Sequence, residues 1–496
     1  MSRLNKDILF LIFKELQDDS KSLFSCLMVN KLWCETVIPI LWRNPWSYNI
    51  NYDDKNYLFM IIVFYLTNDT KELLMRQGIQ LPSIPYQSLL FDYLSYCRSI
   101  NINIINSIIS IGSSFDYDQF ILQQEFYNLF MKKFPKLKYL DMESINHQLF
   151  YFPEAELRLV SLCELRCDTS IDTSYFYGLA RLCKYIQRLV IINVDMNANL
   201  NGIAKLIEVQ KNLKHFKWAD EFVDYPLIKD SQKIIFHELE KKANNLNSLE
   251  VFFHYEHKFI QEILTKFHKL KILRIENYLF FNEEQLKKLN MQVFHQLEIL
   301  NIEHNKINVI SNIIENSGER LKKILFRPRD SLNYEFDDLN ENSLNFIRKI
   351  YENCPLIEYL SITFCPSKEH FTEFEKLLKV CKKLKSLLII IFNNSMAETH
   401  KKKMENGEEL LNVLIKSTPT NLREIRFFDH FKFSLEVLEE FLGKWRGCAL
   451  TIVTKDSIYR GEDYKKVINK YKNYGVIKDF RCETYEYNVN YLSYLM

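Results

Sequence analysis

Residues 297–307, LEILNIEHNKI, contain the pattern that decides the fold of this chain. Its apolar and asparagine positions are Leu297, Leu300, Ile302, Asn305 and Ile307. Apolar residues that alternate over so short a run are typical of a strand with one buried face. The side chain of an asparagine placed just after such a strand can hydrogen-bond the backbone of the next turn. The stretch therefore predicts a short strand followed by a tight turn.

The same Leu-x-x-Leu-x-apolar spacing recurs along most of the chain. Its first positions are Leu137, Leu162, Ile186, Leu213, Leu249, Leu270, Leu297, Leu321, Ile357, Leu384, Leu422 and, less completely, Leu450. Most steps between these positions are 21 to 28 residues, and three are 36 to 38 residues. A step near two dozen residues with alternating apolar positions is typical of leucine-rich repeats. The sequence predicts about 12 irregular repeats between residues 134 and 463.

Amphipathic helical stretches, such as 234–243, 344–351 and 371–380, lie between these strand signals. A strand followed by a helix, repeated, gives a parallel sheet with helices on one side. A single repeat cannot bury its apolar face, so stacking of neighbouring repeats supplies the core. The expected fold is α/β, a helical head followed by a curved solenoid with concave parallel strands and convex helices. The alternative is an ordinary mixed α/β domain whose leucine strings arise from composition.

The repeats match the consensus unevenly. Asn305 and Cys365 occupy the position that closes the turn, but other repeats have residues there that cannot make the same hydrogen bonds. These are Ile145, Val194, Glu221, His257 and Arg329. The longer steps require insertions such as 327–342 and 393–407. Residues 464–496 are rich in tyrosine and lysine, and we expect them to cap the open end of the solenoid.

Residues 1–46 are predicted to form a separate helical head. Apolar residues recur at one-face helical spacing from Ile8 to Leu16, and Asp19 offers a cap for a second helix. A third helix runs toward Ile38, where Pro39 limits its continuation. One interpretation is a cap on the repeats.

Residues 47–133 are expected to form a helical linker and the start of the solenoid. Helices are expected at 58–66 and 86–97, a turn at 81–85, and either a strand or a helix at 101–111. The long separation of Trp46 from Leu137, the first clear repeat position, favours a head with its own partner over a cap. Exposed Ile12 and Phe13 would then form an interface.

The apolar order within the head resembles the F-box family. The matching positions are Leu4, Ile8, Leu9, Ile12, Phe13, Leu16, Val29, Asn30, Lys31, Trp33, Leu41, Trp42 and Arg43. The family pattern begins with a Leu-Pro pair and carries Val-Cys-Lys-x-Trp in its third helix. This chain has Asn5 in place of that proline and Asn30 in place of that cysteine.

The resemblance implies a substrate-recognition subunit of a Skp–cullin–F-box type ubiquitin ligase, similar to the expanded F-box families of some fungi. It implies that the head binds a Skp-type adaptor, and through it a cullin, while the concave face holds a protein target. The implied adaptor contacts or their supports are Leu4, Ile8, Leu9, Ile12, Phe13, Leu16, Leu27, Val29, Trp33, Leu41 and Trp42. Two other possibilities remain open, a repeat scaffold without a ligase role and an enzyme with a hidden site.

The sequence indicates no catalytic group, cofactor or metal. Ten glycines in 496 residues form no phosphate-binding loop. The pair His254 and His257 has no neighbouring cysteine, and Cys163 and Cys167 lack a second pair, so neither predicts a metal site.

Composition also argues against nucleic-acid and membrane partners. The net charge of +2 gives no general attraction to nucleic acid, and the longest apolar run, 58–66, is shorter than the roughly 20 residues of a spanning helix. Without a recognisable leader, we expect an intracellular protein of the cytoplasm or nucleus with reduced cysteines.

Overall fold

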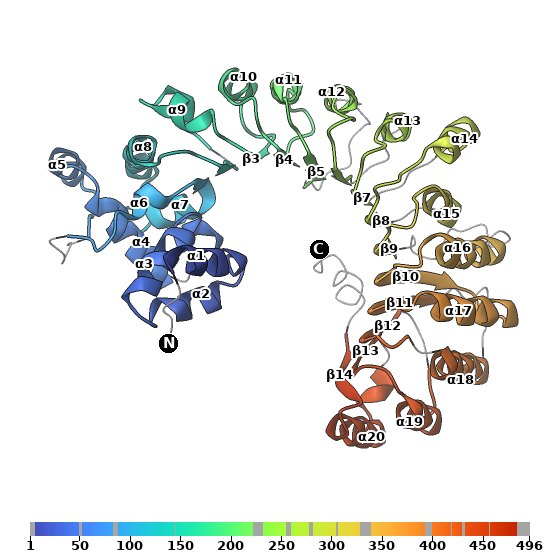
Figure 1. The fold of residues 1–496 in the computed structure, drawn as a ribbon. Helices are drawn as coiled ribbons and strands as arrows, with labels where there is room; N and C mark the ends of the chain where they lie inside the picture. Colours follow the sequence, from blue (N-terminus) through green and yellow to red (C-terminus); the bar gives the residue numbers. More distant parts are fainter. Residues whose placement is uncertain are drawn as a thin grey trace. The chain divides into compact units, whose positions relative to one another are not determined.

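The computed structural model divides the chain into two compact units, Met1–Lys242 and Ala243–Met496 (Figure 1). The structure describes residues 5–48, 52–82, 88–143, 145–221, 232–253, 259–276, 281–303, 306–327, 339–391, 399–417, 419–428, 432–455 and 457–483. In both units strands and helices alternate along the chain, and within each unit the strands follow one another in sequence order and pair in parallel. The helices lie on one side of the strands in each unit.

The first unit begins with helices and continues with five described strands. The strands are β1 (Ser99–Asn101), β2 (Tyr139–Asp141), β3 (Glu164–Asp168), β4 (Arg188–Asn193) and β5 (His215–Asp220). The helices are α1 (Lys6–Glu15), α2 (Ser20–Leu27), α3 (Lys31–Leu41), η1 (Pro45–Ser47), α4 (Tyr52–Phe64), α5 (Asn68–Arg76), α6 (Tyr93–Tyr96), α7 (Ile102–Ile109), α8 (Asp116–Lys133), η2 (Leu149–Tyr151), α9 (Ala155–Leu159), α10 (Thr173–Leu182), α11 (Asn201–Val209) and α12 (Lys233–Glu240).

The second unit repeats the strand-and-helix alternation through nine described strands. The strands are β6 (Ser248–Phe252), β7 (Ile272–Glu276), β8 (Ile299–Glu303), β9 (Lys323–Arg327), β10 (Tyr359–Phe364), β11 (Ser386–Ile391), β12 (Glu424–Phe428), β13 (Leu450–Thr454) and β14 (Ile477–Cys482). The helices are α13 (Phe259–Ile263), η3 (Leu264–Lys266), α14 (Glu283–Met291), α15 (Ile307–Glu315), α16 (Leu339–Asn353), α17 (Lys368–Val380), α18 (His400–Ser417), α19 (Leu435–Lys444), η5 (Ser457–Arg460) and α20 (Glu462–Asn473).

The repeated leucine positions form the core between strands and helices. Leu300 pairs with Ile324 in the next strand, and both are fully buried. Because side chains alternate along a strand, the motif residues face the helices and the intervening residues face the opposite side. This confirms the predicted α/β leucine-rich-repeat solenoid and excludes the alternative in which the leucine strings are accidents of composition.

The structure corrects the extent and the register of the repeats. Strand β1 precedes the first predicted repeat, and β14 extends the sheet into the segment assigned as a cap. The repeat predicted at Leu249 begins three residues earlier, because Leu246 is buried at its first position. The last repeat begins one residue before Leu450. Ile452 pairs with Ile425 of β12, which is the fourth residue of the repeat that starts at Leu422.

Several helix boundaries also differ from the predictions. Pro39 lies inside α3, which continues to Leu41; the helix lacks the one hydrogen bond that a proline nitrogen cannot donate. The helix expected at 86–97 is limited in the described residues to α6, and residues 101–111 provide both the end of β1 and α7. The insertion expected at 393–407 ends in a helix, because Lys401–Lys403 lie in the first turn of α18.

A buried polar ladder replaces the consensus asparagine in the first unit. Thr169 donates to Asn193 Oδ1 at 3.1 Å, and Asn193 Nδ2 donates to Asp220 Oδ1 at 2.8 Å. The same Asp220 oxygen accepts from Trp218 Nε1 at 2.8 Å. The Thr169 hydroxyl also accepts from the backbone N–H of Val194, so it closes the turn that a consensus asparagine would otherwise close.

We expect Asn193→Ala to lower the free energy of unfolding by about 1–3 kcal/mol, because it leaves buried polar partners of Asn193 unsatisfied. Asn197→Ala, at an exposed position in the following turn, is the matched control and should change it by less than about 0.5 kcal/mol. Urea unfolding of the full chain measures both. Equal effects of the two substitutions would show that the ladder contributes nothing to the free energy of unfolding.

A buried histidine joins two helices of the second unit. His370 of α17 lies with Nε2 2.8 Å from Ser343 Oγ of α16 and with Nδ1 3.0 Å from Ser367 Oγ. Burial lowers the pKa of His370 to about 4. Because this pKa is below the ordinary value, the folded state favours neutral His370, and this contribution to stability is lost as the pH falls from about 6.5 to about 4.

We therefore expect acidification from pH 7 to pH 5 to cost about 1–2 kcal/mol of stability through His370. His370→Gln places a neutral, non-titrating amide at this position and should remove that part of the pH dependence. Urea midpoints of the wild type and the variant at both pH values measure the difference. Parallel losses in the two proteins would contradict the assignment.

Candidate functional site

Two of the three helices of the head, α2 and α3, begin at side-chain caps that the sequence encodes. Asp19 accepts from Ser22 N at 3.1 Å at the start of α2, and Asn30 accepts from Trp33 N at 3.0 Å at the start of α3. Asn30 stands where the F-box family usually has cysteine, and here it is the helix cap. Such a cap stabilises a helix by about 1 kcal/mol.

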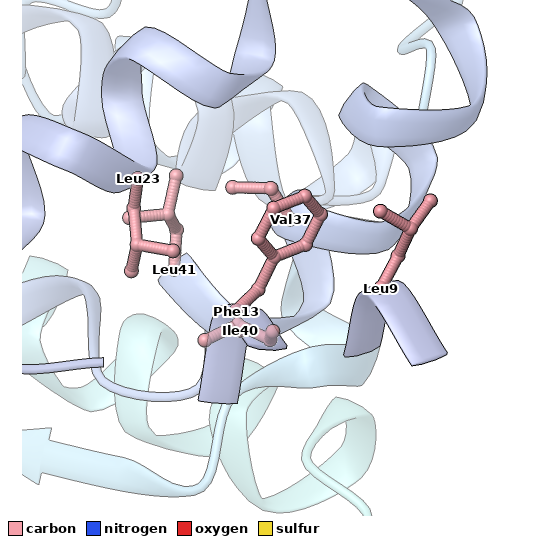
Figure 2. Packing of buried hydrophobic residues seen from close by; sticks show 6 residues of the cluster. All are labelled: Leu9, Phe13, Leu23, Val37, Ile40 and Leu41. Atoms are coloured by element: carbon pink, nitrogen blue, oxygen red, sulfur yellow. The ribbon is translucent and has the colours of Figure 1, made fainter. Parts of the chain in front are cut away.

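The head has its own apolar core, shown in Figure 2. Its buried residues are Leu9, Phe13, Leu23, Val37, Ile40 and Leu41. Phe13 is 1% exposed and packs edge-on against Trp33, with ring centroids 5.1 Å apart. Leu9, Phe13 and Leu41 therefore hold the helices together. The expectation that Phe13 is an exposed interface residue is wrong, because its position on α1 turns it toward α3.

Other apolar residues of the head face outward. Those exposed are Ile8, Leu11 and Ile12 on α1, Phe24 on α2, and Met28 and Val29 in the turn before α3. Ile8, Ile12 and Val29 were among the predicted adaptor contacts, whereas Leu11, Phe24 and Met28 were not. Met28 is 87% exposed. We call these six residues the outer apolar set.

The other predicted contacts are intermediate in burial or not described. Leu16, Leu27, Trp33 and Trp42 are half-buried, and Leu4 lies outside the described residues. Leu27, Leu41 and Trp42 line one pocket of about 490 Å3 between α2, α3, η1 and α4. Tyr48 also lines this pocket, and burial raises its pKa, so its hydroxyl stays protonated and donates to Leu41 O at 3.2 Å. The structure thus brings three predicted residues together in an apolar hollow.

Asn5→Pro tests whether the missing family proline matters. Asn5 has φ −68°, which proline adopts without strain, and its side chain makes no cap hydrogen bond. We expect Asn5→Pro to leave stability unchanged or to raise it by about 0.4–1 kcal/mol, because proline restricts the unfolded chain. Lys14→Pro, in the last turn of the same helix, should cost about 3 kcal/mol. Thermal unfolding compares them; a destabilised Asn5→Pro protein would contradict this reasoning.

The end of the head is fixed to the first strand. Trp46 Nε1 donates to Ser99 O at 2.8 Å, and Arg98 N donates to Arg43 O at 2.9 Å. Ser99 Oγ also donates to Asn44 Oδ1 at 2.7 Å. The end of the head therefore contacts strand β1 directly, although many residues separate Trp46 from Leu137 along the chain. Strand β1 was missed because three residues carry too short a pattern to recognise.

The second candidate surface is the strand face opposite the helices in the second unit. Charged and polar side chains stand here at alternate positions, including Glu250 and Arg274, whose charged groups lie 3.7 Å apart. Lys323 lies over the ring of Tyr359 at 4.9 Å from its centroid. Such mixed polar and aromatic faces are suited to binding proteins rather than one small molecule.

Within the described ranges, no group of three or more histidine, cysteine, aspartate or glutamate residues could hold a metal ion. Burial raises the pKa of the Cys167 thiol, and that side chain packs in the core as expected. His254, His257 and Asn305 lie outside the described residues. Among the described helices, none is long and apolar enough to cross a membrane.

Together, the parallel strands, the outer helices and the buried leucine ladder define an α/β leucine-rich-repeat protein with a helical head. Comparisons with known proteins identify no family for this chain. No family model matches the chain, and the search of curated proteins finds no match. Among solved structures it is similar to an internalin, inlF, from Listeria monocytogenes str. 4b F2365. That likeness has 14% identity and a TM-score of 0.37, and covers 78% of this chain and 96% of the internalin chain.

Proposed function

We propose that this protein is a substrate-recognition subunit of a Skp–cullin–F-box type ubiquitin ligase. The head would bind a Skp-type adaptor, and the strand face of the repeats would hold a protein target. The observation that carries the proposal is that the head has two groups of apolar residues, one buried and one exposed. Leu9, Phe13 and Leu41 form its core, whereas the outer apolar set stays in water.

Six large apolar side chains exposed on α1, on α2 and in the turn before α3 favour association with another surface. Apolar area removed from water contributes about 25 cal/mol per Å2, so covering such residues can stabilise a complex considerably. Their order along the chain matches the F-box pattern at Ile8, Ile12 and Val29. The exposed apolar residues and the family pattern therefore coincide at three positions of the head.

In this role the protein needs no catalytic group of its own. A bound target would be held beside the ubiquitin-loaded enzyme, and its effective concentration there would reach the millimolar range. The chemistry would belong to other subunits. The repeats would supply selectivity, and the hydrogen bond from Trp46 to Ser99 would hold the head against strand β1 of its own unit.

A repeat scaffold without a ligase role is the second candidate, and one observation favours it. The head is hydrogen-bonded to strand β1 through Trp46 and Arg98, as a terminal cap would be. A cap explains the buried residues of the head and its contact with β1. It does not explain why Met28 and Leu11 remain exposed.

Binding of the purified full chain to a recombinant Skp-type adaptor distinguishes the two candidates. We expect a stable complex in size-exclusion chromatography and a dissociation constant below about 1 µM, equivalent to roughly 8 kcal/mol. Met28→Glu should weaken it, whereas Tyr151→Glu, at an exposed aromatic position on η2, is the matched control. A folded wild-type chain that binds no adaptor would favour the scaffold.

A further inference from the structure

A row of side chains on the helix-free face of β10–β13 is buried although it points away from the core. Ser361, Leu388, Arg426 and Val453 stand at paired positions on successive strands. All four are at most 1% exposed. Their neighbours along each strand, such as Leu387 and Ile425, are the motif residues that face the helices. We call these four residues the inner strip.

The strip cannot be covered by its own members. Arg426 is the largest of them, and its flanking residues Leu388 and Val453 are shorter, yet Arg426 is 0% exposed. Ser361 is too small to cover Leu388. Since α16–α19 pack on the other face, burial of this row requires a further layer of chain on the strand side.

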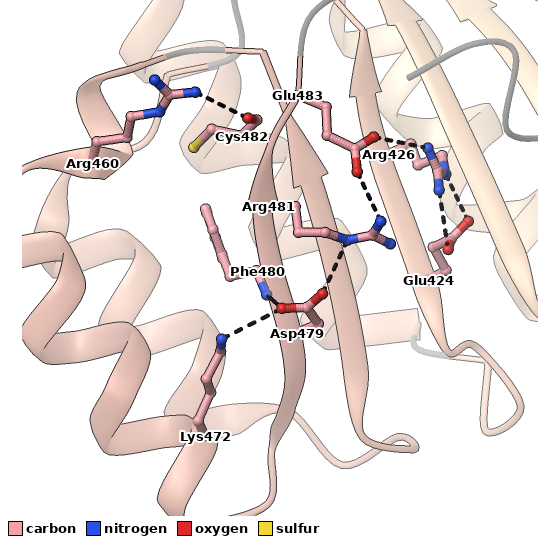
Figure 3. A network of polar contacts seen from close by, with 9 residues as sticks. All are labelled: Glu424, Arg426, Arg460, Lys472, Asp479, Phe480, Arg481, Cys482 and Glu483. Carbon is pink, nitrogen blue, oxygen red and sulfur yellow. Dashed lines mark hydrogen bonds and ion pairs between the residues drawn. The ribbon is translucent and has the colours of Figure 1, made fainter. Parts of the chain in front are cut away.

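The polar contacts around the strip show where the chain approaches it (Figure 3). Arg426 Nε donates to Glu424 Oε1 at 2.7 Å, and its Nη1 lies 3.8 Å from Glu483 Oε2. Glu483 directly follows β14, and its backbone N donates to Thr454 O at 2.9 Å. The carboxylate of Glu483 thus reaches across β13, so the last described residue lies beside the inner strip.

We propose that residues 484–496, which follow Glu483, occupy the inner strip as a built-in ligand of the target-binding face. Their sequence is TYEYNVNYLSYLM, with four tyrosines, two leucines and a single charged residue. Tyrosine and leucine side chains can cover Leu388 and Val453, the two apolar members of the strip. Tyrosine hydroxyls can also satisfy polar groups at its border.

Length permits this occupancy. An extended segment of this size spans about 40 Å at roughly 3.3 Å per residue. The strip crosses three gaps between strands, about 14 Å at roughly 4.8 Å each. The segment begins beside Arg426, so it can cross the whole strip without crossing the rest of the sheet.

Two polar atoms on this strand face have no hydrogen-bond partner among the described residues. The hydroxyls of Ser361 and Thr363 are buried without a hydrogen-bond partner. Each such group costs about 1–3 kcal/mol. A target peptide that satisfies both hydroxyls could therefore displace the segment. That consequence rests on the proposed target-binding role, whereas occupancy of the strip does not depend on the ligase role.

Photo-crosslinking tests the occupant in the full chain without any adaptor. A benzophenone amino acid replaces Leu388 or, at the border of the strip, Arg481; Lys217 of β5 is the control position. We expect mass spectrometry to find peptide 484–496 linked from positions 388 and 481 and not from 217. Links from both positions only to 328–338, 392–398 or 429–431, or no link, would overturn the proposal.

Peptide competition provides the second measurement. A chain ending at Glu483 should bind synthetic TYEYNVNYLSYLM at least tenfold more tightly than the full chain does, and a scrambled peptide should bind neither. If the shortened chain fails to fold, a protease site placed after Glu483 allows cleavage of the folded protein. The released peptide should then rebind, and failure to rebind would count against the proposal. Because no adaptor is present, these results stand apart from the test of the ligase role.

Discussion

Ile12→Asp should abolish binding of a Skp-type adaptor while leaving the head folded. Ile12 is exposed in the free protein, so a change there alters the free energy of unfolding by about 0.5 kcal/mol or less. An aspartate at the centre of an apolar interface loses the buried area and must be desolvated without a partner. We expect a loss of at least 2 kcal/mol in binding, equivalent to about 30-fold or more.

The adjacent change, Phe13→Asp, should instead unfold the head. Phe13 fills the core shown in Figure 2 and contacts Trp33. Removing a buried phenylalanine costs about 3–5 kcal/mol, and an unpaired buried carboxylate adds to that cost. Two neighbouring positions on one helix therefore separate recognition from folding.

Phe13→Leu is the matched control, since it keeps an apolar side chain in the core. It should bind the adaptor with nearly wild-type affinity and unfold at a slightly lower temperature. Circular dichroism, thermal unfolding and calorimetric titration with the adaptor measure all three proteins. If the folded Ile12→Asp protein binds the adaptor normally, α1 is not the contact surface. That result would contradict the proposed binding of the adaptor through α1.

The strand positions could be predicted because each repeat core depends on residues close together in sequence. Leu300 and Ile302 define a strand by themselves, and stacking fixes the rest. The errors arose where neighbouring residues are equally apolar. Around Leu249 both Leu246 and Val251 offer alternative registers, and only pairing with β7 selects one.

The site was harder to predict than the fold. Ile12 and Phe13 are adjacent in sequence and equally apolar. Ile12 is exposed and Phe13 is buried because α3 packs against only one side of α1. Likewise, no local pattern predicts the hydrogen bond between Trp46 and Ser99, because the two residues are 53 positions apart in the sequence. Long-range contacts of this kind depend on the tertiary arrangement.

Arg426→Ala should destabilise the second unit by about 3–5 kcal/mol. Arg426 is fully buried and pairs with Glu424, which also accepts from Ser386 Oγ at 2.9 Å. Removing the guanidinium leaves the carboxylates of Glu424 and Glu483 in a poorly solvated place without their cation. An uncompensated buried charge of this kind is far more costly than the pair itself is stabilising.

A double change separates that cost from lost packing. Arg426→Met combined with Glu424→Gln keeps most of the side-chain volume. It also removes the Glu424 carboxylate, so only Glu483 is left without its cation. The double variant should therefore lose clearly less stability than Arg426→Ala. Lys385→Ala, which breaks a half-exposed pair with Glu358, is the control and should cost at most about 1 kcal/mol. Urea unfolding measures the series. If Arg426→Ala falls within 1 kcal/mol of the wild type, water reaches the strip and the inner layer over β12 is not there.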